Sequence, residues 1–263
     1  MSPAGTLVIP AHNAAVFLER TLHSVAQQDV SSTELEVILV NDASSDDTED
    51  LARRFLARLP FESQLVSLSK QRGPGRARNE AILRAQGRFI MLLDADDELE
   101  PAAVSTTLHF LQRNPAVQYC YSRLSLVDEH GELLSRKPGV PTFSRSALLH
   151  YNYVSHLKCF THSLHNEIGG YSEEMHCEDY DHVLRASELL EPAQIAQIPV
   201  YLYRYRLHSG NRSQLESVTT RTDAAKAIEA SLLRKERMKS CVRYSHRTEH
   251  SGGGYAYYSH NLL

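Results

Sequence analysis

The segment Phe89–Glu100, FIMLLDADDELE, combines an apolar run with a dense group of acidic residues. An apolar run typical of a buried strand leads into five carboxylates within seven positions: Asp94, Asp96, Asp97, Glu98 and Glu100. Two unit charges about 5 Å apart repel by roughly 3 kcal/mol at an effective dielectric near 20. Either these acids spread into water, or positive charge lies among them.

The residues before this segment alternate short apolar runs with helical patterns. Strands are predicted over residues 6–10, 36–42, 64–68 and 88–94, and helices over 15–28, 47–59, 76–86 and from Pro101 to about 112. Such alternation predicts an α/β fold with a mostly parallel sheet and helices on both faces. Ligands of such sheets bind at the carboxyl ends of the strands, so we expect one crevice there.

Polar side chains follow the first two predicted strands. The first strand runs into PAHN and the second into NDASSDD, which places Asn13 and Asp42 at strand ends. Asp42 and Ser44 are typical caps of a following turn and helix. Alternatively, the Asp42 carboxylate accepts the ring N–H of a pyrimidine base. The residues alone leave both interpretations open.

The segment after the third strand is basic and rich in glycine. Residues 72–79 read RGPGRARN, with two glycines and three arginines in eight positions. Arg76 and Arg78 lie where a helix is predicted to begin, and a helix N-terminus with guanidinium groups suits an anion. A solvated basic turn is the alternative. The glycine spacing differs from that of a Walker loop or a dinucleotide fingerprint.

Asp94 and Asp96 are separated by one residue at the end of the fourth strand. Both carboxylates can approach one hard cation there, and a cation would relieve their repulsion. Mg²⁺ typically combines one or two carboxylates with substrate phosphates, and Mn²⁺ has similar preferences. We expect Glu98 and Glu100 to spread into water, because acids are common near a helix start such as Pro101.

The second half of the chain is less regular. Residues 117–134 predict two strands joined by a turn at His130–Gly131, Cys177 opens a helix, and residues 200–208 alternate as a strand whose tyrosines pack. A helical pattern from about 216 to 240 leads into a basic end. Residues 234–263 hold six basic and two acidic side chains, a balance of +4 that leaves −8 for the remainder of a chain of net charge −4.

Composition excludes several classes of protein. A pI near 6.4 argues against a general nucleic-acid binder. Four cysteines without a CxxC pair predict a reduced, cytoplasmic protein. The first apolar run is too short for a signal peptide, and no run of about 18 apolar residues predicts a membrane span. Fourteen histidines occur without a CxxC pair, so no zinc site is expected and most histidines are expected at the surface.

Six segments occur in the order and approximate spacing of the family 2 inverting glycosyltransferases, which have the GT-A fold. They are VIPAHN, VNDASSDDT, RGPGRARN, LLDADD, EIGGYSEEMHCEDYDHVLR and YRLHSGNRS. The resemblance covers about residues 5–213. It implies a GT-A domain over 1–215, with a nucleotide-binding half at about 1–100 and an acceptor half at about 101–215. Residues 216–263 would form a C-terminal helix and a flexible basic tail.

The resemblance also implies roles for individual residues. Asp42 would read uracil, Asp94 would contact the ribose, Asp96 the metal, His208 the metal or diphosphate, and Asp179 would be the catalytic base. The implied nucleotide-binding set is Pro10, His12, Asn13, Asp42, Arg72, Arg76, Asp94 and Ala95, with metal ligands Asp96 and His208, and Gly169, Gly170 and Glu178 in the donor/acceptor pocket. Gly169–Gly170 could equally be a helix C-cap. The sequence departs from the family at His162, where an arginine is frequent, and in NDAS for the usual DDGS.

The implied function is metal-dependent transfer, with Mn²⁺ or Mg²⁺, of a sugar from a nucleotide diphosphate, UDP by the Asp42 match. The acceptor would be a sugar or lipid-linked sugar hydroxyl in polysaccharide or glycoconjugate assembly. A sugar nucleotidyltransferase would need a glycine-rich loop after the first strand, which PAHNAAV is not. A binding module without catalysis is opposed by the retained Asp96, Asp179 and His208. The basic tail could bring a cytoplasmic enzyme to the inner membrane face, and a solvated tail is the alternative.

Overall fold

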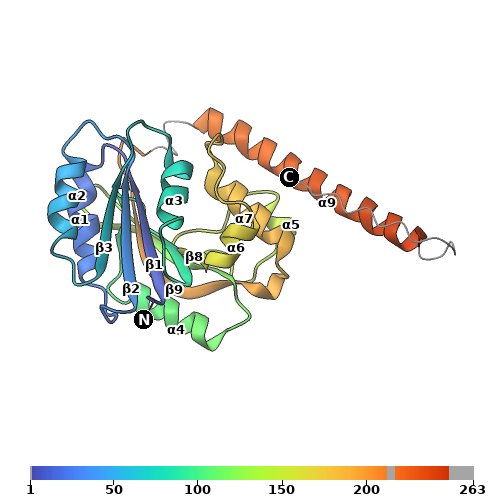
Figure 1. The fold of residues 1–263 in the computed structure, drawn as a ribbon, viewed down its shortest axis with the longest axis horizontal. Coiled ribbons are helices and arrows are strands. Elements are labelled where there is room, and N and C mark those ends of the chain that lie inside the picture. The colour runs from blue at the N-terminus through green and yellow to red at the C-terminus, as the bar shows by residue number, and fades with distance from the viewer. Residues whose placement is uncertain (1, 212–216, 249–263) are drawn as a thin grey trace.

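The computed structural model describes residues 2–211 and 217–248, and describes side chains for 2–211 and 221–236. Within those residues, nine strands form one sheet in the order β3-β2-β1-β4-β8-β6-β9-β5, with β7 paired to β6 (Figure 1). The strands are β1 Gly5–Ala11, β2 Leu35–Asn41, β3 Glu62–Ser67, β4 Phe89–Leu92, β5 Glu98–Leu99, β6 Tyr119–Val127, β7 Leu133–Lys137, β8 Lys158–Thr161 and β9 Ile195–Arg206.

Helices cover both faces of this sheet (Figure 1). They are α1 Ala15–Ala26, α2 Thr48–Leu56, α3 Pro74–Ile82, α4 Ala103–Arg113, α5 Arg145–Leu148, α6 His162–Glu167, α7 Glu178–Leu189 and α9 Ser217–Thr248, with a 3₁₀ turn at Pro192–Gln194. The α/β fold and the alternation of strands and helices in the first half are therefore confirmed.

Strands β1 to β4 form the parallel part of the sheet. Strand β1 pairs in parallel with β2 and with β4, and β2 pairs in parallel with β3. All four strands therefore end at the same edge. That edge carries the polar segments which the sequence places after each strand.

Beyond β4 the sheet is mixed. Strand β8 is antiparallel to both of its neighbours, β4 and β6, whereas β6 and β9 run parallel. The short β5 pairs antiparallel with β9, with Glu98 opposite Arg204. This pairing returns the end of β9 to the acidic segment, so that residues more than a hundred positions apart meet there.

Side-chain alternation along the strands divides the core into two clusters. Leu7 and Ile9 pack with α1, α2 and α4 on one face, and Val8 packs with α3 and α7 on the other. Successive strand residues point to opposite faces, so each buried strand feeds both clusters. The end of β4 therefore has α1 on one side and α3 with α7 on the other.

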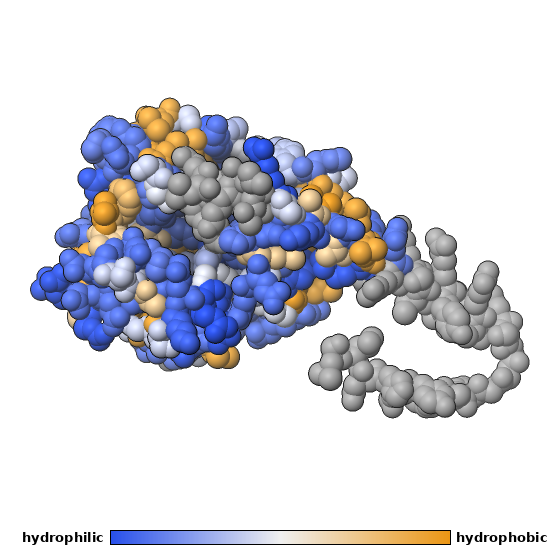
Figure 2. Space-filling view, turned by 90° about the horizontal axis from the view of Figure 1, so that it is seen from above, coloured by the Kyte–Doolittle hydropathy of each residue, from blue (hydrophilic) through white to orange (hydrophobic). Residues whose placement is uncertain are grey.

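Helix α9 packs along α7 and then extends away from the body (Figure 1). Ala227 and Ser231 are buried at this contact, where Ser231 donates to Glu188 at 2.6 Å and Arg234 donates to the same carboxylate at 2.7 Å. The predicted C-terminal helix is thus confirmed, and the predicted flexible segment around Gly252–Gly254 lies outside the described residues. None of the helices in the described part has the length and apolar character needed to cross a membrane. The face in Figure 2 is mostly hydrophilic, with scattered apolar groups.

Candidate active site

The loops after β1 and β2 are fastened to each other at the parallel edge. His12 donates from Nδ1 to the Asp42 carbonyl at 2.8 Å. Asn13 has φ 49°, a left-handed conformation that asparagine tolerates, and its Oδ1 accepts from the Ser45 amide at 2.8 Å. Pro10, opposite Val40 in the sheet, precedes this loop. The predicted nucleotide-binding residues of β1 and β2 therefore lie together.

Asp42 is buried and holds the loop after β3. Its two carboxylate oxygens accept the backbone N–H groups of Arg72 and Gly73, each at 2.7 Å. The expectation that Asp42 caps the following helix is wrong, because α2 has no side-chain cap and the carboxylate is turned toward the α3 loop. A carboxylate has about four lone-pair sites, so two remain. Recognition of a base by Asp42 stays a prediction.

The N-terminus of α3 is covered by the loop after α6. A Cβ on Gly75 would lie 2.2 Å from the Ser172 carbonyl oxygen, so this close approach requires glycine. From the same loop, Glu173 pairs with Arg76 at 3.0 Å and with Arg72 at 3.8 Å. Arg76 also pairs with Glu80. The two arginines predicted to bind the nucleotide are thus neighbours, and both contact a carboxylate in this structure.

Arg78, the third arginine of the segment, is buried and bridges two acids. It donates to Asp94 at 2.9 Å and to Glu178 at 2.6 Å. Sequence reasoning noted Arg78 but did not include it in the site. A helical wheel could have found it, because Arg78 lies on the face of α3 that buries Ala81 and Ile82.

The acids of the opening segment have different partners. Burial would raise the pKa of Asp94, but Arg78 and then His156 outweigh it and hold that pKa below its usual value. Asp97 is fully enclosed, accepting from the Tyr203 hydroxyl and the Arg206 amide, each at 2.7 Å. Burial, reinforced by Asp96 and Asp94, raises the pKa of Asp97 well above normal. Positive and hydrogen-bonding groups thus lie among the acids.

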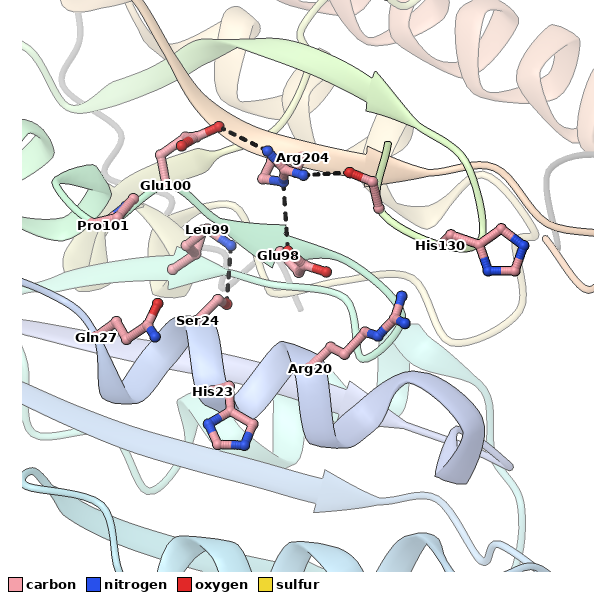
Figure 3. A pocket seen from close by; sticks show the side chains of 11 residues that line it. Arg20, His23, Ser24, Gln27, Glu98, Leu99, Glu100, Pro101, His130 and Arg204 are labelled. Atoms are coloured by element: carbon pink, nitrogen blue, oxygen red, sulfur yellow. Dashed lines mark hydrogen bonds and ion pairs between the residues drawn. The ribbon is translucent and has the colours of Figure 1, made fainter. Parts of the chain in front are cut away.

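Glu98 and Glu100 do not spread into water as expected. The buried Arg206 pairs with Glu98. Arg204 lies 3.5 Å from Glu98 and 3.7 Å from Glu100 (Figure 3). The prediction failed because these arginines arrive on β9, over a hundred residues later in the chain. Arg206 also donates to the Asp96 carbonyl at 3.0 Å and thereby fixes the backbone of the acidic segment.

Asp96 and His208 form the predicted pair, with Asp96 Oδ2 and His208 Nε2 3.0 Å apart. Burial and the neighbouring Asp94 raise the pKa of Asp96 despite the contact with His208. The Gly210 amide donates to His208 Nδ1 at 3.2 Å, which leaves the ring proton on Nε2.

The donor set around Asp96 fits a divalent cation that is completed by its substrate. Among the residues whose side chains are described, no group of three or more His, Cys, Asp or Glu could by itself hold a metal ion. One carboxylate and one imidazole, both partly exposed, supply two ligands. This leaves positions for phosphate oxygens and water, the usual arrangement for Mg²⁺ bound with a phosphorylated substrate.

The first turn of α7 presents three carboxylates in unequal settings. The side chain of Asp179 is 30% exposed, whereas Glu178 and Asp181 are each 6% exposed. Glu178 pairs with Arg78, and Asp181 with Arg185 at 2.6 Å. Asp179 is therefore the one of these three acids that a substrate can reach. Glu178, which was predicted to line the donor/acceptor pocket, is buried against Arg78.

Asp179 has its own buried partner, Lys158, which donates from Nζ to Oδ2 at 2.6 Å. Burial would raise the pKa of Asp179, but Lys158 outweighs this and holds it far below its usual value, with further help from Arg78 and His156. The sequence analysis missed Lys158 and His156. Lys158 begins a strand of four residues, too short to be recognised from its pattern.

The remaining predicted residues lie around this group. Gly169 and Gly170 have φ of 81° and 79° and form the turn after α6, where the Gly170 amide donates to the His165 carbonyl at 3.0 Å. The helix C-cap interpretation is thus confirmed, and a role in the pocket is still a prediction. Ala95 is buried, and its carbonyl accepts from Thr21 at 2.9 Å.

A cavity of about 400 Å³ lies between α1 and β5 (Figure 3). Its lining is polar and includes Arg20 and Ser24 of α1 together with Gln27, Glu98 and Arg204. It contains none of the residues predicted for nucleotide, metal or base. The arrangement of carboxylates at the strand ends, rather than the size of this cavity, identifies the candidate site.

In α/β sheets, ligands bind at the carboxyl ends of the parallel strands, where this chain joins the loops after β1, β2 and β3. Residues 6–171 match the family model described as glycosyl transferase family 2, which is more than half of the 263 residues. The chain therefore belongs to glycosyl transferase family 2.

Similar proteins include two from polysaccharide biosynthesis. Chondroitin synthase of Escherichia coli is 30% identical over 236 residues, covering 88% of this chain and 33% of the synthase. The putative teichuronic acid biosynthesis glycosyltransferase TuaG of Bacillus subtilis is 31% identical over 134 residues, covering 51% of this chain and 52% of TuaG. The chain thus spans about a third of the length of the first of these relatives.

Solved structures have the same fold. Staphylococcus aureus TarS 1–349 in complex with UDP has a TM-score of 0.69 at 20% identity, covering 87% of this chain and 65% of that one. Mannosyltransferase PcManGT from Pyrobaculum calidifontis, in complex with GDP-Man and Mn²⁺, has a TM-score of 0.59 at 19% identity, covering 89% and 65%. The fold is that of the GT-A glycosyltransferases, as expected.

Proposed function

We propose that this chain transfers a sugar from a nucleotide diphosphate, with UDP as the nucleotide, to an acceptor hydroxyl with inversion at the anomeric carbon. The observation that carries the proposal is the position of Asp179. It is the most exposed carboxylate at the start of α7, with Arg78 between its neighbour Glu178 and Asp94. A candidate base therefore lies beside the Arg78 bridge that connects α7 with the end of β4.

The residues have separable tasks in this reaction. Asp94 and Asp42 face the nucleoside, and Arg72 and Arg76 supply positive charge at the N-terminus of α3 for the diphosphate. Asp179 accepts the acceptor proton. As the acceptor oxygen bonds to the anomeric carbon, the bond from that carbon to the diphosphate breaks and its electron pair leaves with the diphosphate. A cation held by Asp96 and His208 would offset the charge of the leaving diphosphate.

The choice of UDP and of a saccharide acceptor is supported by similar proteins. TarS has been solved with UDP and with UDP-GlcNAc, and chondroitin synthase and TuaG are named for polysaccharides. PcManGT, with GDP-Man, makes GDP the competing nucleotide. The proposal includes Mn²⁺ or Mg²⁺ as cofactor and a sugar or lipid-linked sugar as acceptor, in a cytoplasmic protein.

The test is a screen of UDP- and GDP-sugars for release of the nucleoside diphosphate, with and without Mn²⁺, and with saccharide acceptors. The expected result is metal-dependent release from one or a few UDP-sugars, faster when an acceptor is added, with a product of inverted anomeric configuration by NMR. Binding of UDP and Mn²⁺ by calorimetry without any release or transfer would instead support a nucleotide-sugar-binding module.

A further inference from the structure

Lys158 is a buried cation at the start of β8. Its side chain is 1% exposed. Alternation along β8 places Lys158 on the same face as Phe160, whose ring belongs to the core cluster beneath α7. An ammonium group without a partner in such a setting would cost several kcal/mol. Its described partner is Asp179, at 2.6 Å.

This pair differs from the other ion pairs at the start of α7. Glu178 and Arg78 are both buried, and Asp181 is buried against the partly exposed Arg185, as expected for pairs that hold the helix in place. In the pair with Lys158, the cation is enclosed and the carboxylate is partly open. Lys158 reaches Oδ2, and among the described residues no hydrogen bond to Asp179 Oδ1 is seen.

We propose that Lys158 is a positioning residue for the catalytic base: it fixes Oδ2 of Asp179 so that Oδ1 is presented to the acceptor hydroxyl. The inference rests on the proposed function, in which Asp179 is that base. A carboxylate on a short side chain can rotate about two bonds. A single strong, charge-assisted hydrogen bond from a rigid strand fixes that rotation.

The charges around Asp179 make Lys158 the group that controls its ionisation. From other elements, Asp179 faces Lys158, Arg78 and His156, together with Tyr119 and Tyr171, and on its own helix it adjoins Cys177, Glu178 and Asp181. Arg78 is already engaged by Asp94 and Glu178.

His156, Tyr119 and Tyr171 are uncharged near neutral pH, and Glu178 and Asp181 are engaged by Arg78 and Arg185. Burial, followed by Lys158, lowers the pKa of His156 to about 4, and burial raises the pKa of both tyrosines. Because Asp179 is held below its usual pKa, its ionised form persists as the pH falls. Without Lys158 its pKa should rise, and protonation should begin at higher pH.

The experiment compares Lys158→Met, which removes the charge at similar length, with Lys158→Arg, which keeps the charge but changes the reach. For each, kcat/KM is measured against pH with a saturating acceptor, and UDP affinity is measured by calorimetry. Lys226→Met is the matched control, because Lys226 is an exposed lysine of α9 that pairs with Asp223 at 3.0 Å rather than with Asp179.

In Lys158→Met we expect the acid limb of the kcat/KM profile to move up by about 1 to 3 pH units, the usual effect of a nearby opposite charge. UDP affinity should stay within about twofold. In Lys158→Arg the acid limb of the profile should stay at low pH, because the positive charge beside Asp179 is kept. The value of kcat should fall, because the longer side chain no longer holds the Asp179 carboxylate in the same position. An acid limb at the wild-type position in a folded Lys158→Met variant would overturn the proposal.

A second readout does not depend on turnover. Proteins labelled with carboxyl-¹³C aspartate can be titrated by NMR, with Asp179→Asn identifying the resonance. The Asp179 titration should move up in Lys158→Met and stay low in Lys226→Met, and an unmoved midpoint would overturn the role of Lys158. If wild type transfers no sugar from any donor, the proposed function and this role fail together. If wild type is active and only the Lys158 readouts are unchanged, this inference alone fails.

Discussion

At the carboxyl ends of the parallel strands, Asp94, Asp96 and Asp97 differ in the side chain that each one contacts. Asp94 has a guanidinium, Asp96 an imidazole and Asp97 a phenol. Arg78 keeps the pKa of Asp94 low against burial, whereas burial and neighbouring acids raise those of Asp96 and Asp97. Four consecutive residues can therefore contain a candidate ribose ligand, a candidate metal ligand and a structural acid.

The partners of Asp96 lead to a prediction about metal binding. Asp96→Ala should abolish the Mn²⁺-dependent part of UDP binding, because His208 alone would then remain from the pair. Calorimetry with UDP in the presence and absence of Mn²⁺ measures this. Asp47→Ala, an exposed acid at the start of α2, is the control. A variant at Asp96 that binds UDP and Mn²⁺ as tightly as wild type would show that the metal lies elsewhere.

The setting of Asp179 predicts the effect of removing its basicity. Asp179→Asn keeps the shape of the side chain, so UDP affinity should be nearly unchanged. The transfer rate should fall by at least about a hundredfold, the scale of losing a general base. Single-turnover transfer assays measure this, with Asp181→Asn as comparison. The base would have to be reassigned if Asp179→Asn kept most of its activity while a change at Glu178 or Asp181 removed it.

Asp42 holds the loop before α3 and is also predicted to contact the nucleotide. Binding of two ligands, UDP and inorganic diphosphate, can distinguish these two roles. If Asp42 contacts uracil, Asp42→Ala should weaken UDP binding more than binding of inorganic diphosphate. If it only holds the amides of Arg72 and Gly73, both ligands should lose affinity equally. Calorimetric titration of one variant with the two ligands decides between these outcomes, and we expect the larger loss for UDP.

At the scale of elements, the N-terminus of α3 and the loop after α6 form one unit. The absence of a side chain at Gly75 lets the loop backbone approach, and Glu173 then reaches Arg72 and Arg76. The Glu173 carboxylate is therefore bound to the same two guanidinium groups that are proposed to bind the diphosphate of the donor. Donor binding therefore has to compete with Glu173.

This competition predicts that Glu173→Gln binds the donor more tightly. Each exposed ion pair is worth at most about 1 kcal/mol, so loss of the two pairs should not raise the affinity by more than roughly thirtyfold. It should shrink as salt is raised, because salt screens the pairs in wild type. Calorimetry with UDP at two salt concentrations measures this, with the neighbouring exposed Glu174→Gln as control. Equal or weaker binding by Glu173→Gln would remove these arginines from the diphosphate site.

The elements that sequence patterns could predict are those with long apolar runs. Strands β1 to β4 and helices α1 to α4 were found because each carries its own periodicity. Strand β5 has two residues and β8 has four, beginning with a lysine, so neither shows a pattern. The buried cations were missed for a related reason: Arg78 and Glu178 are separated by 100 positions, and an arginine without its partner looks like a surface residue.

For the whole molecule, the uneven charge of the chain predicts a surface contact. Deleting residues 237–263 removes much of the basic end but keeps the Arg234–Glu188 pair that holds α9 on α7. We expect the truncated protein to transfer sugar normally but to lose co-sedimentation with anionic liposomes, since basic segments bind such surfaces. Neutral liposomes are the control. Unchanged co-sedimentation would mean that the tail is only solvated.

The segments on the two sides of the strand ends are held by different kinds of contact. On the side of β9, the buried Arg206 bonds to Glu98 and to the carbonyls of Asp96, Asp128 and Glu129. On the side of α3, Glu173 makes pairs that lie at the surface. Breaking the Arg206 contacts exposes a buried cation that has lost its partners, which costs several kcal/mol. Breaking the surface ion pairs of Glu173 costs at most about 1 kcal/mol for each pair. The spent nucleotide should therefore leave past α3, with its rate of exit set by that loop and not by the strand ends that recognise it.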